Sequence, residues 1–244
     1  MTDWRFNLIL GFIVTSFILT WLIPPIAQDP AYHLFADRRT FLGLPNFFDV
    51  ISNLPFLAAG ALGLRALSLH KQLLSHRAWQ IFFTGVLLVS AGSAYYHYSP
   101  DNASLVWDRL PMTIGFMGVF IALLSEYPGK AIHSSWLALM VLFGIGTVVY
   151  WDFTDDLRFY AWVQFMPLCV AAILFILYRP RFSHSRMFIL ALAFYMAAKL
   201  TEYYDVLIYE VSGEIVSGHT LKHLLAAAGS YTLVLLLERR RALP

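Results

Sequence analysis

Five residues of this sequence have side chains that could perform chemistry together, although they come from distant parts of the chain. Ser93 and His97 lie four positions apart at the end of one apolar run, and Asp108 opens the next. Far downstream, His219 and His223 begin another apolar run. Residues four apart share a helix face, so these two histidines could bind one metal ion. A third histidine would complete the three protein ligands that catalytic zinc commonly takes.

The residue types also suit a particular reaction. Zinc lowers the pKa of its bound water to about 7, which supplies a nucleophile at neutral pH. A carboxylate such as Asp108 can take the proton of that water and pass it to a leaving amine. A hydroxyl such as Ser93 can share the stabilisation of an oxyanion with the metal. The pattern therefore points to hydrolysis, provided that the helices bring these residues together.

The composition indicates where such helices would lie. Of the 244 residues, 59% are hydrophobic and 13% are charged, whereas a soluble domain carries about 25% charged residues. Too few charges remain to cover a water-facing surface, so the composition predicts an integral membrane protein. The net charge of +2 gives no indication of a nucleic-acid partner. The single cysteine, Cys169, cannot form an internal disulfide.

Eight apolar runs are long enough to cross a bilayer as helices. The first lacks the basic start and the cleavage site of a signal peptide, so we interpret it as a membrane helix. The predicted spans are 6–26, 47–69, 79–96, 105–124, 134–150, 157–178, 187–209 and 219–237. The sequence thus predicts an all-α membrane fold, with a seven-helix bundle preceded by one extra N-terminal transmembrane helix.

The expected organisation has four parts. An N-terminal transmembrane helix occupies residues 1–27, and an outer polar loop, amphipathic enough to lie on the membrane surface, occupies residues 28–46. The seven-span domain covers residues 47–238, and a basic tail covers 239–244. Most lysines and arginines fall on the side of the termini, so the positive-inside rule places both termini in the cytoplasm and the region around His97 on the outer side.

Each candidate residue also has a structural interpretation. The Ser93 hydroxyl could bond to the Val89 carbonyl, and Asp108 could be an acid that the helix dipole favours. An H-x-x-x-H pair alone is weak, and the remaining histidines fall in loops or at their edges, including His70 at the cytoplasmic side. Because His97, His219 and His223 share one membrane depth with Ser93 and Asp108, we favour a common site.

A second polar group is predicted on the seventh span. Lys199, Glu202 and Asp205 follow one another at intervals of three, which gives a polar stripe that faces the bundle. Charges within a span are costly unless they are paired or line a wet cavity. We favour an internal ion pair that orients the helices. The alternative is a group that supports the zinc site or binds a polar head group.

The pattern Ser93-x-x-x-His97, Asp108 and His219-x-x-x-His223 resembles the signature of the alkaline ceramidase family. That family belongs to a superfamily of seven-span zinc membrane hydrolases and receptors that also includes the progestin and adiponectin receptors. The order, spacing and helix placement match, and the similarity extends over the seven spans from 47 to 237. The segment 47–54, with its Ser-Asn pair, also resembles the family's first core helix. The extra N-terminal helix lies outside the resemblance.

The resemblance implies a role for each residue. His97, His219 and His223 would bind Zn²⁺, Asp108 would handle the proton of the metal-bound water, and Ser93 would stabilise the oxyanion. The implied partner is a membrane lipid, and the implied reaction is hydrolysis of an amide bond in a ceramide-like sphingolipid.

Calcium is not assigned by the resemblance. Eukaryotic ceramidases hold calcium in an acidic segment before the first core helix. Here that region contains Asp37, Asn46 and scattered acids without the family's dense acidic motif.

Two other functions fit parts of the pattern. A non-catalytic receptor or sensor could use the same zinc bundle to bind a lipid. A metal or proton transporter would need polar residues along its whole path, whereas the inner halves of these spans are nearly free of charge. The presence of both Ser93 and Asp108 beside the histidines favours an enzyme.

Overall fold

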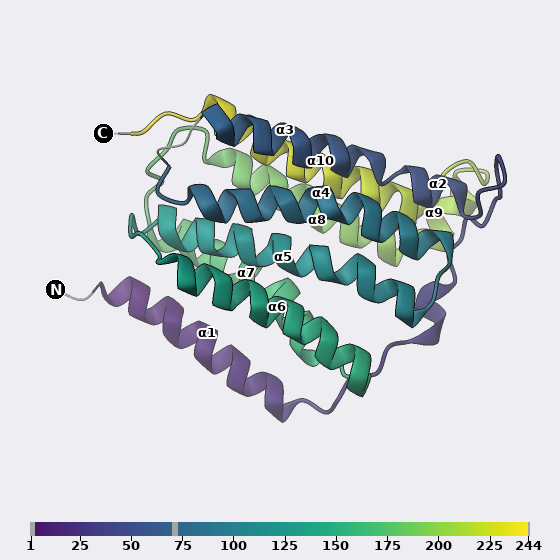
Figure 1. Ribbon diagram of the computed structural model, residues 1–244, viewed down its shortest axis with the longest axis horizontal. Coiled ribbons are helices and arrows are strands. Elements are labelled where there is room, and N and C mark those ends of the chain that lie inside the picture. Colours follow the sequence, from purple (N-terminus) through teal and green to yellow (C-terminus); the bar gives the residue numbers. More distant parts are fainter. Residues whose placement is uncertain (1–2, 70–72, 244) are drawn as a thin grey trace.

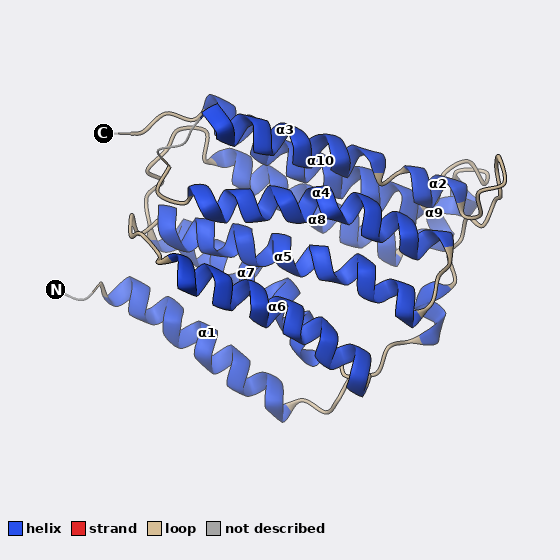
Figure 2. Cartoon of the chain, viewed as in Figure 1, coloured by secondary structure: helices blue, strands red, loops and turns tan. Residues whose placement is uncertain are grey.

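The structure is a computed structural model that describes residues 3–69 and 73–243 (Figure 1). Among these residues, every regular element is a helix (Figure 2). The long helices run roughly side by side, and the connecting segments gather at the two ends of the bundle. The predicted all-α architecture is therefore confirmed. Residues at the edges of the predicted segments, among them His70, lie outside the described residues.

The chain forms one 3₁₀ turn and a series of α-helices. In order they are α1 (Trp4–Leu22), η1 (Pro30–His33), α2 (Phe47–Ile51), α3 (Leu54–Leu69), α4 (His76–Tyr98), α5 (Asn102–Glu126), α6 (Ser134–Thr154), α7 (Arg158–Leu177), α8 (Arg186–Tyr203), α9 (Asp205–Val211) and α10 (Gly218–Arg239).

Seven stretches of the described residues are long and apolar enough to cross a membrane. They are α1, the combined α2 and α3, and α4, α5, α6, α7 and α10. The chain is therefore a multi-pass membrane protein. The remaining predicted span, now α8, carries the charged residues Arg186, Lys199 and Glu202 within its 18 residues and is not among these seven. It nevertheless packs along α10 within the bundle.

Two of the predicted continuous spans are divided in the structure. The span 47–69 breaks between α2 and α3, where the Ser52 hydroxyl and the Asn53 amide both donate to the Asp49 carbonyl, at 3.0 and 2.8 Å. Side chains that compete in this way for backbone acceptors favour helix ends. The span 187–209 breaks between α8 and α9, where Asp205 opens the second helix. Both breaks lie at the end of the bundle that contains the candidate residues.

The pairing of α4 with α5 forms the centre of the bundle. The two helices approach closely because Gly92 of α4 faces the backbone of α5, where a Cβ atom would collide with the Trp107 carbonyl oxygen. About two turns away, a Cβ at Gly85 would lie only 2.5 Å from the Gly115 nitrogen. Small residues permit such close helix contacts in membranes. The contact brings the end of α4 next to the beginning of α5.

The extra helix α1 lies at the edge of the bundle against α7 (Figure 1). The Trp162 indole donates to Ser16 Oγ at 3.1 Å, and the Tyr178 hydroxyl donates to Asp3 at 2.7 Å. That hydrogen bond lowers the pKa of Asp3. The start of α1 and the end of α10 lie at the same end of the bundle. The assignment of this end to the cytoplasm stays a prediction from the charge bias.

A buried ion pair closes the end of the bundle where α10 finishes. The Glu126 carboxylate at the end of α5 accepts two bonds from Arg240, both of 2.9 Å. It also accepts from the Trp79 indole at 2.7 Å and from the Ser75 hydroxyl. The side chains of both charged partners are only 4% exposed. This network joins α4, α5 and the end of α10.

The replacement Arg240→Met should destabilise the protein strongly. It would leave the Glu126 charge buried without its partner, which typically costs about 3–5 kcal/mol. The expected result is a melting temperature several degrees lower in detergent. Arg239→Met provides the matched control, because that neighbouring arginine is exposed and its removal should change the melting temperature little. Equal melting of both variants would show that the ion pair contributes nothing.

Candidate functional site

Three buried histidines meet at the end of the bundle opposite α10's last turn. His97 lies in the last turn of α4, and His219 and His223 lie in the first two turns of α10. The Nε2 atom of His97 is 3.2 Å from that of His223 and 3.3 Å from that of His219. The structure therefore brings together the three histidines that the sequence singled out, and the group could hold a metal ion.

The spacing of these nitrogens suits zinc. Zn–N distances of about 2.0–2.1 Å at tetrahedral angles correspond to nitrogen separations of about 3.4 Å. Among the described residues, the Nε2 atoms of these buried imidazoles have only one another and the Lys222 ammonium as partners, and a buried lone pair without a partner is unfavourable. Three protein nitrogens also leave one tetrahedral position open, as in catalytic zinc sites. The donor set thus fits a zinc ion in both distance and number.

Ser52 determines which nitrogen of His223 carries the proton and which carries the lone pair. Its hydroxyl donates to the Asp49 carbonyl at 3.0 Å, so its oxygen accepts the Nδ1 proton of His223 at 2.8 Å. The Nε2 atom of His223 then carries the lone pair that faces the other histidines. Such outer hydrogen bonds fix the tautomer and the ring orientation of metal-binding histidines.

Two carboxylates hold the beginning of α10 in place. Asp49 of α2 accepts from the Thr220 hydroxyl at 2.7 Å and from the Ser217 hydroxyl at 3.2 Å. Asp205 of α9 accepts from the backbone nitrogen of His219 at 2.7 Å. Acidic groups are stabilising at a helix N-terminus because of the helix dipole. Asp205, expected in the polar stripe of α8, therefore positions the helix that carries two of the histidines.

A glycine allows this close approach. Gly218 opens α10 at the junction of α8 and α9, and a Cβ atom there would collide with the Thr201 carbonyl oxygen and lie 2.7 Å from the Asp205 Cα. Any larger residue would push the first turn of α10 away from Asp205.

Ser93 and Asp108 line the cavity that His223 also lines. Both are buried, and the Ser93 hydroxyl lies beside the Asp108 carboxylate across the close contact of α4 and α5. Within the described residues, the group of possible metal ligands comprises the three histidines and does not include Asp108. The carboxylate thus shares a cavity with His223 without belonging to the ligand group.

Lys222 is a further member of this polar group that the sequence pattern did not single out. The ammonium of Lys222 lies 2.9 Å from the Nε2 atom of His219 and 3.0 Å from the Glu202 carboxylate. Glu202 also accepts from Lys199 at 2.6 Å and from the Tyr32 hydroxyl at 3.1 Å. The predicted ion pair of α8 is therefore present, and it extends to α10. The sequence did contain an indication of this contact, because the three-residue interval between His219 and Lys222 places both side chains on one helix face.

The segment 28–46 covers the histidines, whereas the sequence suggested that it lies on the membrane surface. The Phe35 ring packs against the rings of His97 and His219, with centroids 4.7 and 4.6 Å apart. The Asn46 amide donates to the His97 carbonyl at 2.8 Å. Burial raises the pKa of the Tyr32 phenol well above its usual range, so it stays a hydrogen-bond donor to Glu202. The segment 28–46 therefore packs over the histidines through buried contacts, and it does not simply lie on the membrane surface.

The two residues considered for calcium are engaged within the chain. The Asp37 carboxylate accepts from the Arg39 guanidinium at 2.9 and 2.6 Å. Asn46 holds the end of α4 as described above.

A cavity extends from the histidines into the bundle. Its volume is ≈ 410 Å³, and it lies among α5, α7, α8 and α10. Its polar end contains Ser93, Asp108 and the charged groups of α8 and α10. Further in, its walls are apolar, with residues such as Val119, Phe175 and Leu233. The cavity therefore joins a polar, reactive end to a space suited to a hydrocarbon chain.

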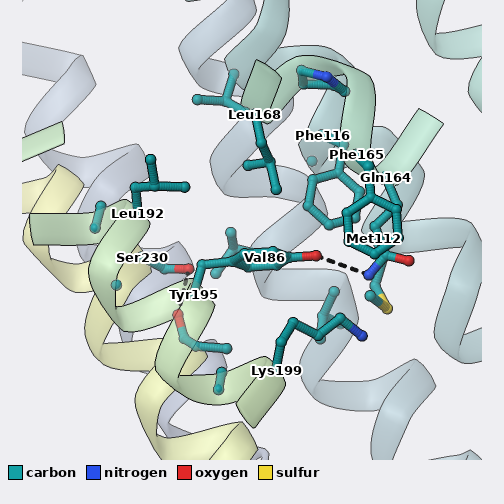
Figure 3. Close-up of a pocket in the computed structure, with 18 of the residues that line it drawn as sticks. Val86, Met112, Phe116, Gln164, Phe165, Leu168, Leu192, Tyr195, Lys199 and Ser230 are labelled. Atoms are coloured by element: carbon teal, nitrogen blue, oxygen red, sulfur yellow. Dashed lines mark hydrogen bonds between the residues drawn. The ribbon is translucent and has the colours of Figure 1, made fainter. Parts of the chain in front are cut away.

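Figure 3 shows the middle of this cavity. The Gln164 amide of α7 donates to the Tyr195 hydroxyl of α8 at 2.8 Å, and this bond crosses the cavity. Ser230 of α10 lies on the same wall region as Tyr195, and Lys199 points into the cavity one turn further along α8. Both helices line the cavity, and the Phe175 ring of α7 also meets the Phe188 ring of α8, with centroids 6.0 Å apart.

Comparison with known proteins identifies a matching family. The family model described as Ceramidase matches residues 44–243, which excludes α1 and most of the segment 28–46. No curated protein matches the chain. The match covers α2 to α10 and hence all of the candidate residues.

The replacement Ser52→Ala should weaken metal binding without removing a ligand. Loss of the hydroxyl leaves the Nδ1 proton of His223 without an acceptor, and changes of this kind typically cost about 10- to 100-fold in metal affinity. Competition between the protein and a chelator for added Zn²⁺ would measure the effect. Ser68→Ala is the control, because that hydroxyl is exposed and bonds only to the Arg65 carbonyl within its own helix. Unchanged affinity in Ser52→Ala would show that Ser52 does not orient the ring.

Proposed function

Because this chain belongs to the ceramidase family, we propose that it is a zinc-dependent hydrolase that cleaves the amide bond of a ceramide-like membrane lipid. The family and the apolar helices already make it a membrane enzyme with a lipid substrate. The observation that carries the proposal is the meeting of three histidine Nε2 atoms beside Ser93 and Asp108, at the polar end of an apolar cavity.

The histidines would hold the metal. Their Nε2 atoms converge at 3.2 and 3.3 Å, and Ser52 keeps the nitrogen of His223 unprotonated. Zinc, when bound, supplies Lewis acidity that polarises a carbonyl group and lowers the pKa of water to about 7. The chain's own residues then supply orientation, proton transfer and charge stabilisation.

Asp108 is proposed as the general base and acid. Its carboxylate is buried and lies beside the Ser93 hydroxyl, in the cavity that would hold the amide. It would accept a proton from the attacking water and deliver it to the amide nitrogen when the C–N bond breaks, so that the amine can leave neutral. No second acid is needed, because one proton moves from water to nitrogen.

Ser93 is proposed as a donor to the oxyanion. A hydroxyl aimed at the oxygen on which negative charge develops stabilises the transition state in a cavity that excludes water. The close contact at Gly92 keeps Ser93 next to α5, so the donor is held in place before the substrate arrives. The apolar walls formed by Val119, Phe175 and Leu233 would take the acyl chain. A lipid would enter from the side, between α7 and α8, whose backbones come close at few points.

The enzyme is favoured over a non-catalytic receptor by a specific feature. A receptor needs a cavity and a structural metal, but not a carboxylate and a hydroxyl placed together beside the metal position. Ser93 and Asp108 provide both groups. We also propose, from the charge bias, that both termini are cytoplasmic and that the site opens towards the outer side.

Purified protein should contain about one zinc ion per chain, as expected for a three-histidine site. Replacement of His97, His219 or His223 by alanine should remove the metal, because each supplies one converging nitrogen. The control is His133→Ala, since His133 caps the exposed start of α6. Elemental analysis of the purified variants measures the effect. Unchanged zinc in His219→Ala would show that the ligand assignment is wrong.

The replacement Asp108→Asn should abolish most hydrolysis while zinc and fold remain. Asparagine keeps the shape but cannot accept the proton, and loss of a general base typically costs about 100- to 10,000-fold in rate. Zinc content, melting temperature and fatty-acid release are measured on both proteins. The sequence suggested that Asp108 opens this helix, but Asp101 caps α5 and Asp108 lies in its second turn. If Asp108 has only a structural role inside the helix, turnover should persist in Asp108→Asn. Loss of zinc would instead make Asp108 a ligand, and no turnover by either protein would favour a receptor.

A further inference from the structure

The polar end of the cavity contains more positive than negative charge. Three cations line it, from Arg109, Lys199 and Lys222, but only two carboxylates, from Asp108 and Glu202. A metal ion on the histidines would add further positive charge. Unbalanced charge is expensive within a membrane protein, and it is usually compensated by a partner or by a ligand.

The two lysines must share one carboxylate. Glu202 accepts from Lys199 at 2.6 Å and from Lys222 at 3.0 Å. Among the described residues, neither lysine has an ion pair with any other acid, and Arg109 has none at all. Arg109 is instead held by Gln28 at 2.6 Å and lies over the Trp151 ring at 4.0 Å. The arginine therefore has a polar and aromatic setting of its own, whereas the two lysines share Glu202 as their one ion-pair partner, with Asp108 as a further acid at the same end of the cavity.

Both lysines retain donors that face the cavity. An ammonium has three N–H donors, and Lys199 uses one of them in the bonds described here. Its side chain is 31% exposed, and it points into the cavity (Figure 3). Lys222 uses one donor on Glu202 and one on the Nε2 atom of His219. A metal ion on that nitrogen would occupy its lone pair and release the second donor.

The position of the pair indicates which half of a substrate it would meet. The acyl chain would occupy the apolar part of the cavity, on the side of Gln164 and Tyr195 that lies away from Lys199. The amide must lie by the histidines and Asp108. Lys222 is on the same turns of α10 as the histidines, and Lys199 lies opposite on α8, one turn beyond Tyr195. The amine half of the substrate would therefore lie beside Lys199 and Lys222.

We propose that Lys199 and Lys222 bind an anionic group, a carboxylate or a phosphate, on the amine half of the substrate. Acidic N-acyl lipids are then preferred over neutral ceramide with the same acyl chain. This inference rests on the proposed amide hydrolysis and adds to it the charge of the head group. Both anions accept two or more charge-assisted hydrogen bonds, which is what two neighbouring ammonium groups supply.

Binding and hydrolysis of three probes test the inference. The probes share a hexadecanoyl chain: neutral ceramide, ceramide 1-phosphate and N-hexadecanoylglycine. The dissociation constant of each is measured in uncharged detergent micelles, and amide cleavage is followed by release of hexadecanoate. We expect at least one acidic probe to bind about tenfold or more tightly than ceramide, since hydrogen bonds to charged groups are worth at least a factor of this size. The acidic probe that binds more tightly shows whether the preferred anion is a phosphate or a carboxylate.

The replacement Lys199→Met should remove most of this preference, and Lys199→Arg should retain it because the positive charge remains. Lys130→Met is the matched control, since that lysine lies over the Phe6 ring at the other end of the bundle. Equal or tighter binding of neutral ceramide by the unchanged protein would overturn the inference, whatever the variants do. So would an acidic preference that survives in Lys199→Met.

The two proposals fail in different ways. If no probe is cleaved, the proposed hydrolysis is wrong, and the ratio of dissociation constants still decides the inference about charge. If ceramide is cleaved and binds as well as the acidic probes, the hydrolysis stands and the preference for an anion is wrong.

Discussion

The position of α10's first turn is the constraint on which the rest of the site depends. Two of the three converging histidines lie on that turn and the next. Asp49 and Asp205 hold it from two sides through hydrogen bonds of 2.7 Å, and Gly218 lets it touch the backbone of α8. Within a membrane bundle, such buried polar groups have no water to bind and must find partners in the protein. The hydrogen bonds that satisfy them also orient the histidines.

The same requirement explains why the segment 28–46 folds over the site. The segment supplies Phe35, which packs on the imidazole rings, and Tyr32, which donates to Glu202. It also supplies Gln28, which accepts from the buried Arg109 guanidinium. A roof of this kind excludes water and thereby strengthens the electrostatic interactions beneath it. The segment is thus part of the site, although most of it lies outside the part of the chain that matches the family.

The cavity combines two environments that a lipid amide requires. Its polar end presents the Asp108 carboxylate, the Ser93 hydroxyl and a lysine pair that shares one acid, while its depth is apolar. The helices that enclose it differ in how tightly they pack. The close contact at Gly92 holds α4 against α5 and thereby fixes the positions of Ser93 and Asp108. In contrast, α7 and α8 meet through side chains, in the Gln164–Tyr195 bond and in the contact of the Phe175 and Phe188 rings, whose centroids are 6.0 Å apart.

The sequence by itself determined the features that depend on local pattern. Apolar runs of bilayer length predict the helices, and the four-residue interval between His219 and His223 places both rings on one face. The sequence also suggested that His97 would join them. It could not give the sharing of Glu202 by two lysines, or the packing of Phe35 on the histidines. Those contacts join residues far apart in the chain. Only the packing of whole helices decides them, because the energy of a buried charge depends on its neighbours in space.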